Sequence, residues 1–283
     1  MVYVIGLGDN KVDYYSNKNI KFPGGNAINF SVVAKRMGLN SYYIGTISND
    51  SDGELVLQSL KEEGINTDFI DRSDDPEEKV FVKIVNGDRH FIKSSRNKRQ
   101  LPNLTQQIID LSVNSLLVHS GCHSNSISIL KTLHEAGATT SFDFSELPKY
   151  HTYDYLKKLG QSVDIAQFSL SDTTEKGTEQ ILNNCKKIGI KYVLTTNGSK
   201  NPVFYDFLNN KKYIGNVKYV SSPIDTMGAG DTYFASFAIN LVNALQKGKV
   251  NSQIMSEIFE KAADISAKEI MNQGSFGYGK GIE

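Results

Sequence analysis

Seven residues near the C-terminal end of the chain place a carboxylate after a run of small side chains. They read Asp-Thr-Met-Gly-Ala-Gly-Asp at positions 225–231, directly before an apolar run at helical spacing. Backbone N–H groups at a helix start lack intrahelical partners and favour negative charge, and glycines let a phosphate approach closely. Such a run is either a turn with an acidic cap or a site for phosphoryl transfer. In the second case the acting groups are Asp231 as base and the amides of Gly228, Ala229 and Gly230 as phosphoryl ligands.

A second polar set lies within the first thirty residues, around a predicted strand and the first predicted helix. Carboxylates and carboxamides suit hydroxyl-rich ligands, because a carboxylate accepts from two hydroxyls and an amide both donates and accepts. A glycine pair would let a sugar approach the backbone. A turn followed by a capped helix explains the same residues without a ligand. The set consists of Asp9, Asp13, Gly24, Gly25, Asn26 and Asn29.

Together the two sets resemble the signatures of the PfkB (ribokinase-like) carbohydrate kinases. That family carries Gly-Asp or Gly-Glu and a further Asp after the first strand, then Gly-Gly-x-x-x-Asn, then Asp-Thr-x-Gly-Ala-Gly-Asp. The matching strings keep this order along almost the whole chain. The resemblance implies ATP-dependent phosphorylation of a primary hydroxyl, with Asp231 as base. It also implies that Asp13, Gly24, Gly25 and Asn29 grip the acceptor sugar, with Asp9 and Asn26 as neighbours.

The resemblance further predicts how the nucleotide and its cations are held. The family's nucleotide loop, Thr-x-Gly-x-x-Gly, matches Thr196, Gly198 and Asn201, and asparagine tolerates the left-handed backbone better than most residues. The family's Asn-x-x-Glu motif, which is linked to the metal, is replaced by Ser-Leu-Ser-Asp at 169–172. The implied cofactors are ATP and Mg²⁺, and the implied monovalent-cation site, for K⁺, includes Asp225.

Within the family the chain resembles the bacterial fructoselysine 6-kinases (fructosamine kinases). The shared strings are Gly-Asp-Asn at 8–10, Gly-Gly-Asn-Ala at 24–27, Val-His at 118–119, Phe-Asp-Phe-Ser at 142–145 and the 224–231 segment. Two alternatives stay open. One is a kinase for a plain ketose, pentose or nucleoside, and the other is a catalytically silent sugar sensor on the same fold.

Strands and helices alternate along most of the chain, which predicts an α/β fold with a parallel, doubly wound sheet. By resemblance this is a ribokinase-like three-layer sandwich with a central mostly parallel sheet and a small β-sheet lid, in a single domain over 1–283. Predicted hairpins at 12–22 and 79–94 interrupt the alternation, so we expect residues of about 11–23 and 76–100 to form the lid. Predicted strands lie at 2–6, 41–47, 115–119, 139–143, 163–167, 191–195, 203–206 and 211–214. Predicted helices lie at 25–37, 52–64, 104–111, 124–136, 152–159, 174–188, 232–245 and 252–272.

Bulk properties exclude several classes of function. The formal net charge is zero, which gives no basic field for nucleic acid or acidic lipid. No apolar run approaches the roughly 20 residues that span a bilayer, and the first residues show neither the basic region nor the long apolar region expected of a signal peptide. Two isolated cysteines provide neither a zinc spacing nor a disulfide framework. We therefore expect a cytoplasmic enzyme with small-molecule partners, and the resemblance implies a homodimer formed through the lid.

Three further features have structural and functional interpretations. His119 and His123 follow or end a predicted strand, where a histidine is more often a structural donor than a substrate ligand. The basic cluster from Arg89 to Arg99 reads as a solvated loop, with one arginine contacting an anionic substrate as the less favoured alternative. The glycine-rich stretch 274–280 imitates a P-loop by spacing, lacks the following helix and reads as a flexible tail.

Overall fold

The computed structural model describes residues 2–85, 88–95 and 99–282. Within these ranges the chain forms one nine-stranded sheet, in the order β13-β12-β11-β10-β9-β8-β1-β4-β5. The strands from β5 to β11 run parallel, and β12 and β13 add an antiparallel edge. The mostly parallel sheet expected from the sequence is confirmed. The strand bounds are β1 Tyr3–Leu7, β4 Asn40–Ser48, β5 Asn66–Ser73, β8 Leu117–Gly121, β9 Thr140–Asp143, β10 Ile165–Ser169, β11 Tyr192–Asn197, β12 Lys200–Asp206 and β13 Lys211–Ile214.

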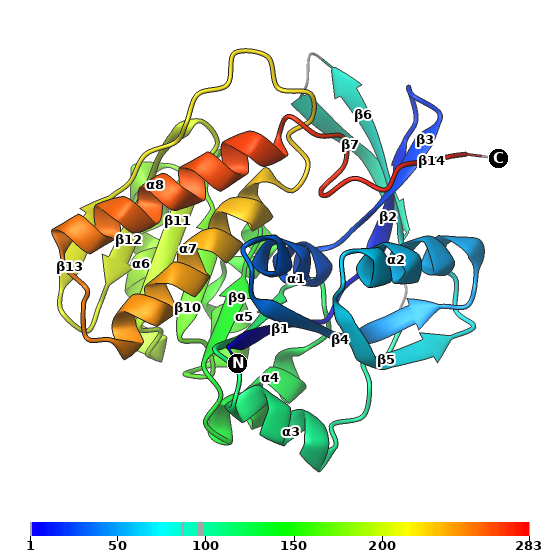
Figure 1. The fold of residues 1–283 in the computed structure, drawn as a ribbon. Helices are drawn as coiled ribbons and strands as arrows, with labels where there is room; N and C mark the ends of the chain where they lie inside the picture. Colours follow the sequence, from blue (N-terminus) through cyan, green and yellow to red (C-terminus); the bar gives the residue numbers. More distant parts are fainter. Residues whose placement is uncertain (1, 86–87, 96–98, 283) are drawn as a thin grey trace.

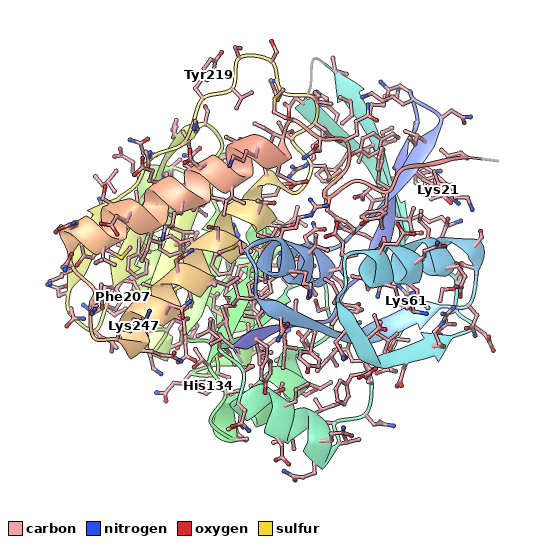
Figure 2. The ribbon with its side chains drawn as sticks, viewed as in Figure 1. Lys21, Lys61, His134, Phe207, Tyr219 and Lys247 are labelled. Carbon is pink, nitrogen blue, oxygen red and sulfur yellow. The ribbon has the colours of Figure 1, made fainter. Side chains whose placement is uncertain are left out.

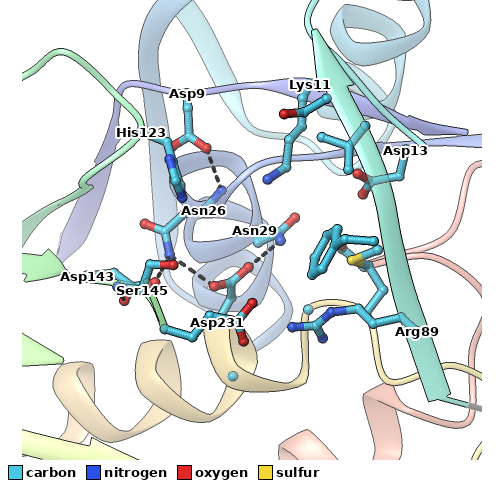
Figure 3. Close-up of a pocket in the computed structure, with 18 of the residues that line it drawn as sticks. Asp9, Lys11, Asp13, Asn26, Asn29, Arg89, His123, Asp143, Ser145 and Asp231 are labelled. Atoms are coloured by element: carbon cyan, nitrogen blue, oxygen red, sulfur yellow. Dashed lines mark hydrogen bonds between the residues drawn. The ribbon is translucent and has the colours of Figure 1, made fainter. Parts of the chain in front are cut away.

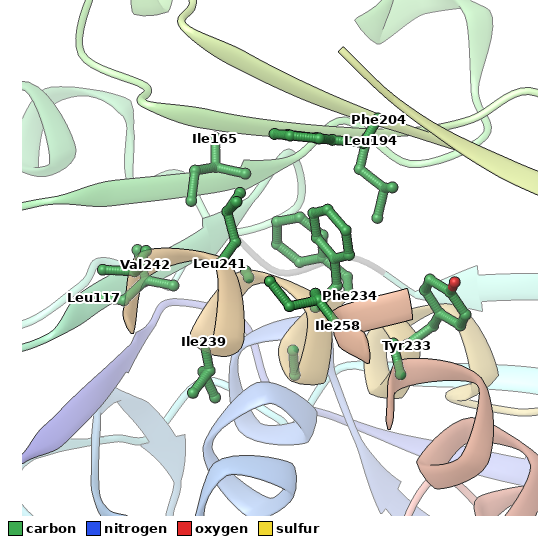
Figure 4. Close-up of a cluster of buried hydrophobic side chains, with 14 of the residues drawn as sticks. Leu117, Ile165, Leu194, Phe204, Tyr233, Phe234, Ile239, Leu241, Val242 and Ile258 are labelled. Atoms are coloured by element: carbon green, nitrogen blue, oxygen red, sulfur yellow. The ribbon is translucent and has the colours of Figure 1, made fainter. Parts of the chain in front are cut away.

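Helices cover both faces of this sheet, because successive residues of a buried parallel strand point to opposite sides. Val4 packs in a core with helices α1, α7 and α8, whereas Ile5 packs in a core with α3, α4, α5 and α6 (Figures 1 and 4). Gly6 lets α1 lie close to β1, since a Cβ there would stand 2.2 Å from Ala27 O. The helix bounds are α1 Asn26–Arg36, α2 Ser51–Glu62, α3 Gln106–Val113, α4 Ile127–Glu135, α5 Tyr153–Leu159, α6 Glu175–Ile188, α7 Ala229–Gln246 and α8 Ser252–Glu269.

A second, five-stranded sheet stands beside the first in the order β14-β3-β2-β6-β7. Both predicted hairpins are present in it, β2 with β3 and β6 with β7, and β2 joins them through parallel pairing with β6. The predicted turn between β6 and β7 includes residues 86–87, which lie outside the described residues. The strand bounds are β2 Lys11–Tyr15, β3 Ile20–Gly24, β6 Lys79–Val85, β7 Asp88–Ser95 and β14 Lys280–Gly281.

Four sequence predictions differ from the structure. The sequence pattern predicts no strand at β5, because this strand lies at the edge of the sheet and contains no buried residue. The glycine-rich tail is ordered: Phe276 is 3% exposed and β14 pairs with β3. Helix α2 covers Ser51–Glu62 rather than 52–64, because the side chain of Asp50 caps it by accepting from the N–H groups of Asp52 and Gly53. Helix α7 begins at Ala229 rather than at 232, so Asp231 lies in its first turn.

The outer surface is polar and charged, with Lys61 on α2 and Lys247 after α7 pointing to solvent (Figure 2). The long connection from β13 to α7 carries Tyr219, which is 83% exposed. Among the described helices, none is long and apolar enough to cross a membrane.

Candidate active site

A large cavity lies where the strand order of the large sheet reverses, at β1. The chain passes from β1 to β4 on one side and later to β8 on the other, and such a switch point opens a crevice at the carboxyl ends of the strands. The pocket measures about 440 Å³. Its walls come from the ends of β1, β9 and β10, from α1 and the start of α7, and from β2, β6 and β7 of the small sheet.

Asp231 lies in the first turn of α7 and is held by two amides of α1 (Figure 3). Asn29 Nδ2 donates to one carboxylate oxygen at 2.6 Å, and Asn26 Nδ2 donates to the other at 2.9 Å. Asn26 Nδ2 also donates to Asp143 at 2.9 Å, so its two protons serve two carboxylates. The positive end of the α7 dipole adds further support to a negative charge here. The predicted base and both predicted asparagines therefore share one site.

Two other carboxyls of the pocket are held partly neutral. Burial raises the pKa of Asp143 to about 7, and the nearby Asp231 carboxylate adds to this shift. Burial likewise raises the pKa of Asp13 to about 6, against the opposing effects of Lys11 and Arg89. Asp13 is fully buried, and neither of its oxygens has a hydrogen-bond partner within the described protein. A buried acceptor without a donor is costly, which makes Asp13 ready for a ligand hydroxyl.

Asp9 caps α1 from outside the helix. Its oxygens accept from the N–H groups of Asn26 at 3.1 Å and Ala27 at 3.3 Å, and from Ser124 Oγ at 2.9 Å. Burial opposes ionisation of Asp9, but Lys11 and these donors outweigh it and lower its pKa. Asp9 lines the pocket and also has this structural task.

Gly24 and Gly25 make room for the two aspartates. A Cβ on Gly24 would stand 2.5 Å from Asp13 Oδ2, and one on Gly25 would stand 2.8 Å from Asp9 O. Gly25 also has φ +129, which side chains rarely adopt. Protein atoms thus occupy the Cβ side of both glycines, neither glycine lines the pocket, and their contact with the sugar stays a prediction.

The two glycines at the start of α7, Gly228 and Gly230, differ in burial. Gly228 is buried with φ +74 and packs on Ser275, while Gly230 is exposed and lines the pocket. The N–H of Ala229 donates to Thr226 O at 3.3 Å, a long bond within the turn. Of the three residues whose amides were predicted to bind the phosphoryl group, Gly228 and Gly230 line the pocket.

The residues predicted to bind nucleotide lie along β11 and β12, beside the pocket rather than in its wall. Thr196 Oγ1 bonds Ser169 Oγ at 3.3 Å, and Ser169 does line the pocket. Gly198 has φ +55 in the tight turn after β11. Asn201 lies in β12 without the left-handed backbone that the sequence interpretation allowed for it.

Asp225 is fully buried and joins three parts of the chain. Its carboxylate accepts from Tyr15 Oη of the small sheet, from Met227 N at 3.0 Å and from Gly274 N at 2.8 Å. These neighbours are donors, whereas a cation needs oxygen acceptors. The described contacts of Asp225 are thus hydrogen bonds within the protein, and its part in a K⁺ site stays a prediction.

Four pocket residues were not assigned roles from the sequence. Lys11 interacts with four carboxylates: burial opposes its charge, but Asp13, Asp9, Asp231 and Glu78 raise its pKa. Arg89 reaches over from β7, donates to Thr226 O at 2.7 Å and lines the pocket, and its contact with an anionic substrate stays a prediction. The others are Asp143 and Gln167. Their positions in the sequence could have indicated a role in the site. Asp143 and Gln167 end consecutive predicted strands, and Lys11 lies between the predicted site residues Asp9 and Asp13.

Comparison with known proteins agrees with this geometry. A model of the pfkB family of carbohydrate kinases matches residues 1–267. Fructosamine kinase FrlD of Bacillus subtilis is 31% identical over 98% of this chain and 93% of its own length. Fructoselysine 6-kinase of Escherichia coli is 25% identical over 82% of this chain and 86% of its own length.

Solved structures show the same ribokinase-like fold. Fructokinase from Xylella fastidiosa with bound ATP superposes with a TM-score of 0.78 at 17% identity, covering 98% of this chain and 94% of that one. Ribokinase of Arabidopsis thaliana complexed with ribose and ATP gives 0.74 at 20% identity, covering 97% and 93%. With the family model and the FrlD match, the chain belongs to the pfkB family of carbohydrate kinases and is a sugar kinase of that type.

Proposed function

We propose that this protein uses ATP to phosphorylate a primary hydroxyl of a sugar conjugate, with a fructoselysine-type compound as the acceptor and O6 as the reacting oxygen. The observation that carries the proposal is the Asp231 carboxylate. It is held by two amides at the start of α7, in a pocket lined by further hydroxyl-binding groups. Asp13, with two unpartnered oxygens, would accept from sugar hydroxyls.

In the proposed reaction Asp231 takes the proton of the acceptor hydroxyl while its oxygen attacks the γ-phosphorus. The bond from phosphorus to the bridging oxygen breaks, ADP leaves, and Asp231 passes its proton to solvent after product release. The amides of Gly228 and Gly230 would stabilise charge on the phosphoryl group. Removing one such donor typically costs about 2.7–4 kcal/mol of transition-state stabilisation.

Mg²⁺ would arrive with the nucleotide. Among the described residues, no cluster of three or more His, Cys, Asp or Glu side chains is arranged to hold a metal. Mg²⁺ commonly keeps waters and binds through substrate phosphates rather than a protein cage, so its role would be to neutralise phosphate charge. The nucleotide would lie along Ser169, Thr196 and Gly198, next to the α7 turn.

The choice of a conjugate over a free sugar rests on the relatives and on the rim of the pocket. The two relatives described above are named a fructosamine kinase and a fructoselysine 6-kinase. The rim carries Glu78, Lys93 and Glu146, and these charges of both signs suit the ammonium and carboxylate groups of a glycated amino acid. The pocket size falls in the range of about 300–1,000 Å³ that is usual for small-molecule sites.

We further propose that the small sheet acts as a lid. Its strands β6 and β7 supply one wall of the pocket, so closing it over bound ligands would exclude the water that competes with the acceptor.

An assay of ADP release over a panel of acceptors tests the function. The panel comprises fructoselysine, a second glycated amino acid, fructose, ribose and a nucleoside, with Asp231→Asn as the inactive control. We expect kcat/KM to be highest for the glycated amino acids, and phosphorus NMR to place phosphate on O6. Preference for fructose or ribose would support the plain sugar kinase instead. Sugar binding without turnover would support the silent sensor.

A further inference from the structure

We propose that His119 is a positioning residue, which fixes the orientation of the Asn26 carboxamide and thereby the alignment of the Asp231 carboxylate. His119 lies in β8 and is not among the residues that line the pocket. The inference rests on the proposed function only in assigning Asp231 the role of base. The hydrogen-bond arrangement itself stands on geometry.

The Asn26 amide has a contact on every polar atom, and those contacts settle its orientation. Nδ2 faces the carboxylates of Asp143 and Asp231, both at 2.9 Å, and Oδ1 faces His119 Nε2 at 2.8 Å. A flipped amide would place its oxygen against two carboxylates. The amide is also tightly packed against Gly121, since a Cβ on that residue would stand 2.8 Å from Asn26 Oδ1.

His119 is built to donate at one nitrogen only. It is 1% exposed and lies between the rings of Phe30 and Phe234, with ring centroids 4.5 and 5.2 Å away. This burial lowers the pKa of His119 to about 3, so the ring is neutral and has one N–H. Because Asn26 Oδ1 needs a donor, that N–H is on Nε2, and Nδ1 accepts from Ser141 Oγ at 2.9 Å.

The arrangement is thus a buried chain from Ser141 through His119 and Asn26 to Asp231. Ser141 is the register partner of His119 on the neighbouring strand, so the sheet itself aligns the first link. Residues that contact a reactive group from behind, as in this chain, orient that group without touching the substrate. If the chain is broken, the amide can rotate and turn its oxygen toward Asp231, which would favour the protonated, inactive carboxyl.

Other charged groups also face this carboxylate and are not themselves substituted in the test, and one of them, Asp143, accepts from the same Asn26 Nδ2. Lys11 and Asp13 come from β2, Asp143 from β9 and Arg89 from β7, and all of them line the pocket with Asp231. None contacts His119 in the described hydrogen bonds. A change in the titration of Asp231 on altering His119 would therefore come through Asn26.

The test compares His119→Phe, which keeps the ring packing and removes the donor, with His119→Gln, which restores an N–H toward Asn26. For His119→Phe we expect kcat to fall by about ten- to a hundredfold with KM changed little, as for other orienting residues. The acid limb of the pH profile of kcat/KM should move up by about one unit. His119→Gln should recover most of both. His134→Phe is the matched control, because that histidine contacts Thr140 and Asp164 instead.

Carbon NMR titration of the Asp231 carboxyl, assigned with Asp231→Asn, supplies a readout independent of turnover. An upward shift of its pKa in His119→Phe, absent in His119→Gln, supports the proposal. Equal titration in all three proteins overturns it, as does an active His119→Phe with an unmoved pH profile. If the wild-type protein phosphorylates no acceptor, the proposed function fails, and the NMR titration alone decides whether His119 orients Asn26.

Discussion

Asp231 is the residue on which the proposed reaction depends, and replacing it separates binding from chemistry. Asp231→Asn removes the proton acceptor while keeping the side-chain shape between Asn26 and Asn29. We expect turnover to fall by at least about a hundredfold, the low end for a general base. Sugar affinity, measured by calorimetry, should change by less than about tenfold, or 1.4 kcal/mol. Turnover close to that of the wild type would exclude Asp231 as the base.

Asp13 should reduce the stability of the ligand-free protein at neutral pH. Its folded pKa of about 6 lies above its ordinary value of 3.8, so the folded state holds the proton more tightly than the unfolded state. Its contribution to stability is therefore largest below about pH 4 and is lost as pH rises through about 6, by up to about 3 kcal/mol. Asp13→Asn does not titrate and should gain relative stability over this interval.

Urea unfolding of both proteins between pH 4.5 and 8 measures this difference. Asp143 is present in both, so its own titration cancels to first order. A difference that is flat with pH would mean that Asp13 titrates normally in the folded protein. Asp13→Asn should also weaken sugar binding, since function and stability conflict at such a buried group.

At the same scale, the sequence predicted the residues that sit in short motifs and missed those brought in by the fold. Asp231, Asn26 and Asn29 converge as expected because two local strings carry them. His119 meets Asn26 across 93 positions of sequence, and no local pattern encodes that contact. The glycine pair was predicted from the room that a sugar would need, whereas the atoms nearest to an added Cβ belong to Asp9, Asn10 and Asp13.

At the scale of elements, the turn into α7 offers a matched pair of glycines. Gly228→Ala forces a side chain into φ +74 and places its Cβ 2.9 Å from Ser275 Cβ, so we expect a loss of about 1–3 kcal/mol of stability. Gly230→Ala meets nothing nearer than Gln167 Nε2 at 4.0 Å. It should fold as well as the wild type and still lose turnover, because its methyl group stands where the phosphoryl group approaches.

Thermal unfolding and kcat, measured on both variants, separate the two effects. Full activity in Gly230→Ala would mean that the amide edge of α7 does not face the transferred group. Equal destabilisation of both variants would contradict the close packing assigned to Gly228 alone.

Helices and strands could be predicted where one buried face gives the sequence a regular spacing of apolar residues. Segments that are held by single contacts to distant residues could not. Strand β5 carries only Phe69 and Ile70 as apolar residues among polar ones, so it shows no alternation. The C-terminal segment looks flexible by composition. It is held by Arg36, whose Nη2 donates to Phe276 O at 2.7 Å, and by Asp225, which accepts from Gly274 N. Both contacts join residues far apart in sequence.

At the scale of the whole molecule, the two sheets enclose one pocket, so acceptor and nucleotide should stabilise the same closed arrangement. Two hydrogen bonds connect the small sheet to the segment before α7. Arg89 of β7 donates to Thr226 O, and Tyr15 of β2, which pairs with β6, donates to the Asp225 carboxylate. Ligands that bridge the layers add to these ties. A ligand at a hundred times its Kd stabilises the folded state by about 2.7 kcal/mol.

We therefore expect Asp231→Asn, which turns over slowly, to show additive increases in Tm with acceptor and with ATP–Mg²⁺. Chelating the divalent ion should remove the increase due to ATP and leave that due to the acceptor, because the acceptor ligands are carboxylates and amides of the protein. Hydrogen exchange in residues 79–85 and 88–95 should slow most with both ligands bound. If chelation abolished the acceptor effect as well, the sugar site would depend on the metal; if exchange in these strands did not change, the small sheet would not close.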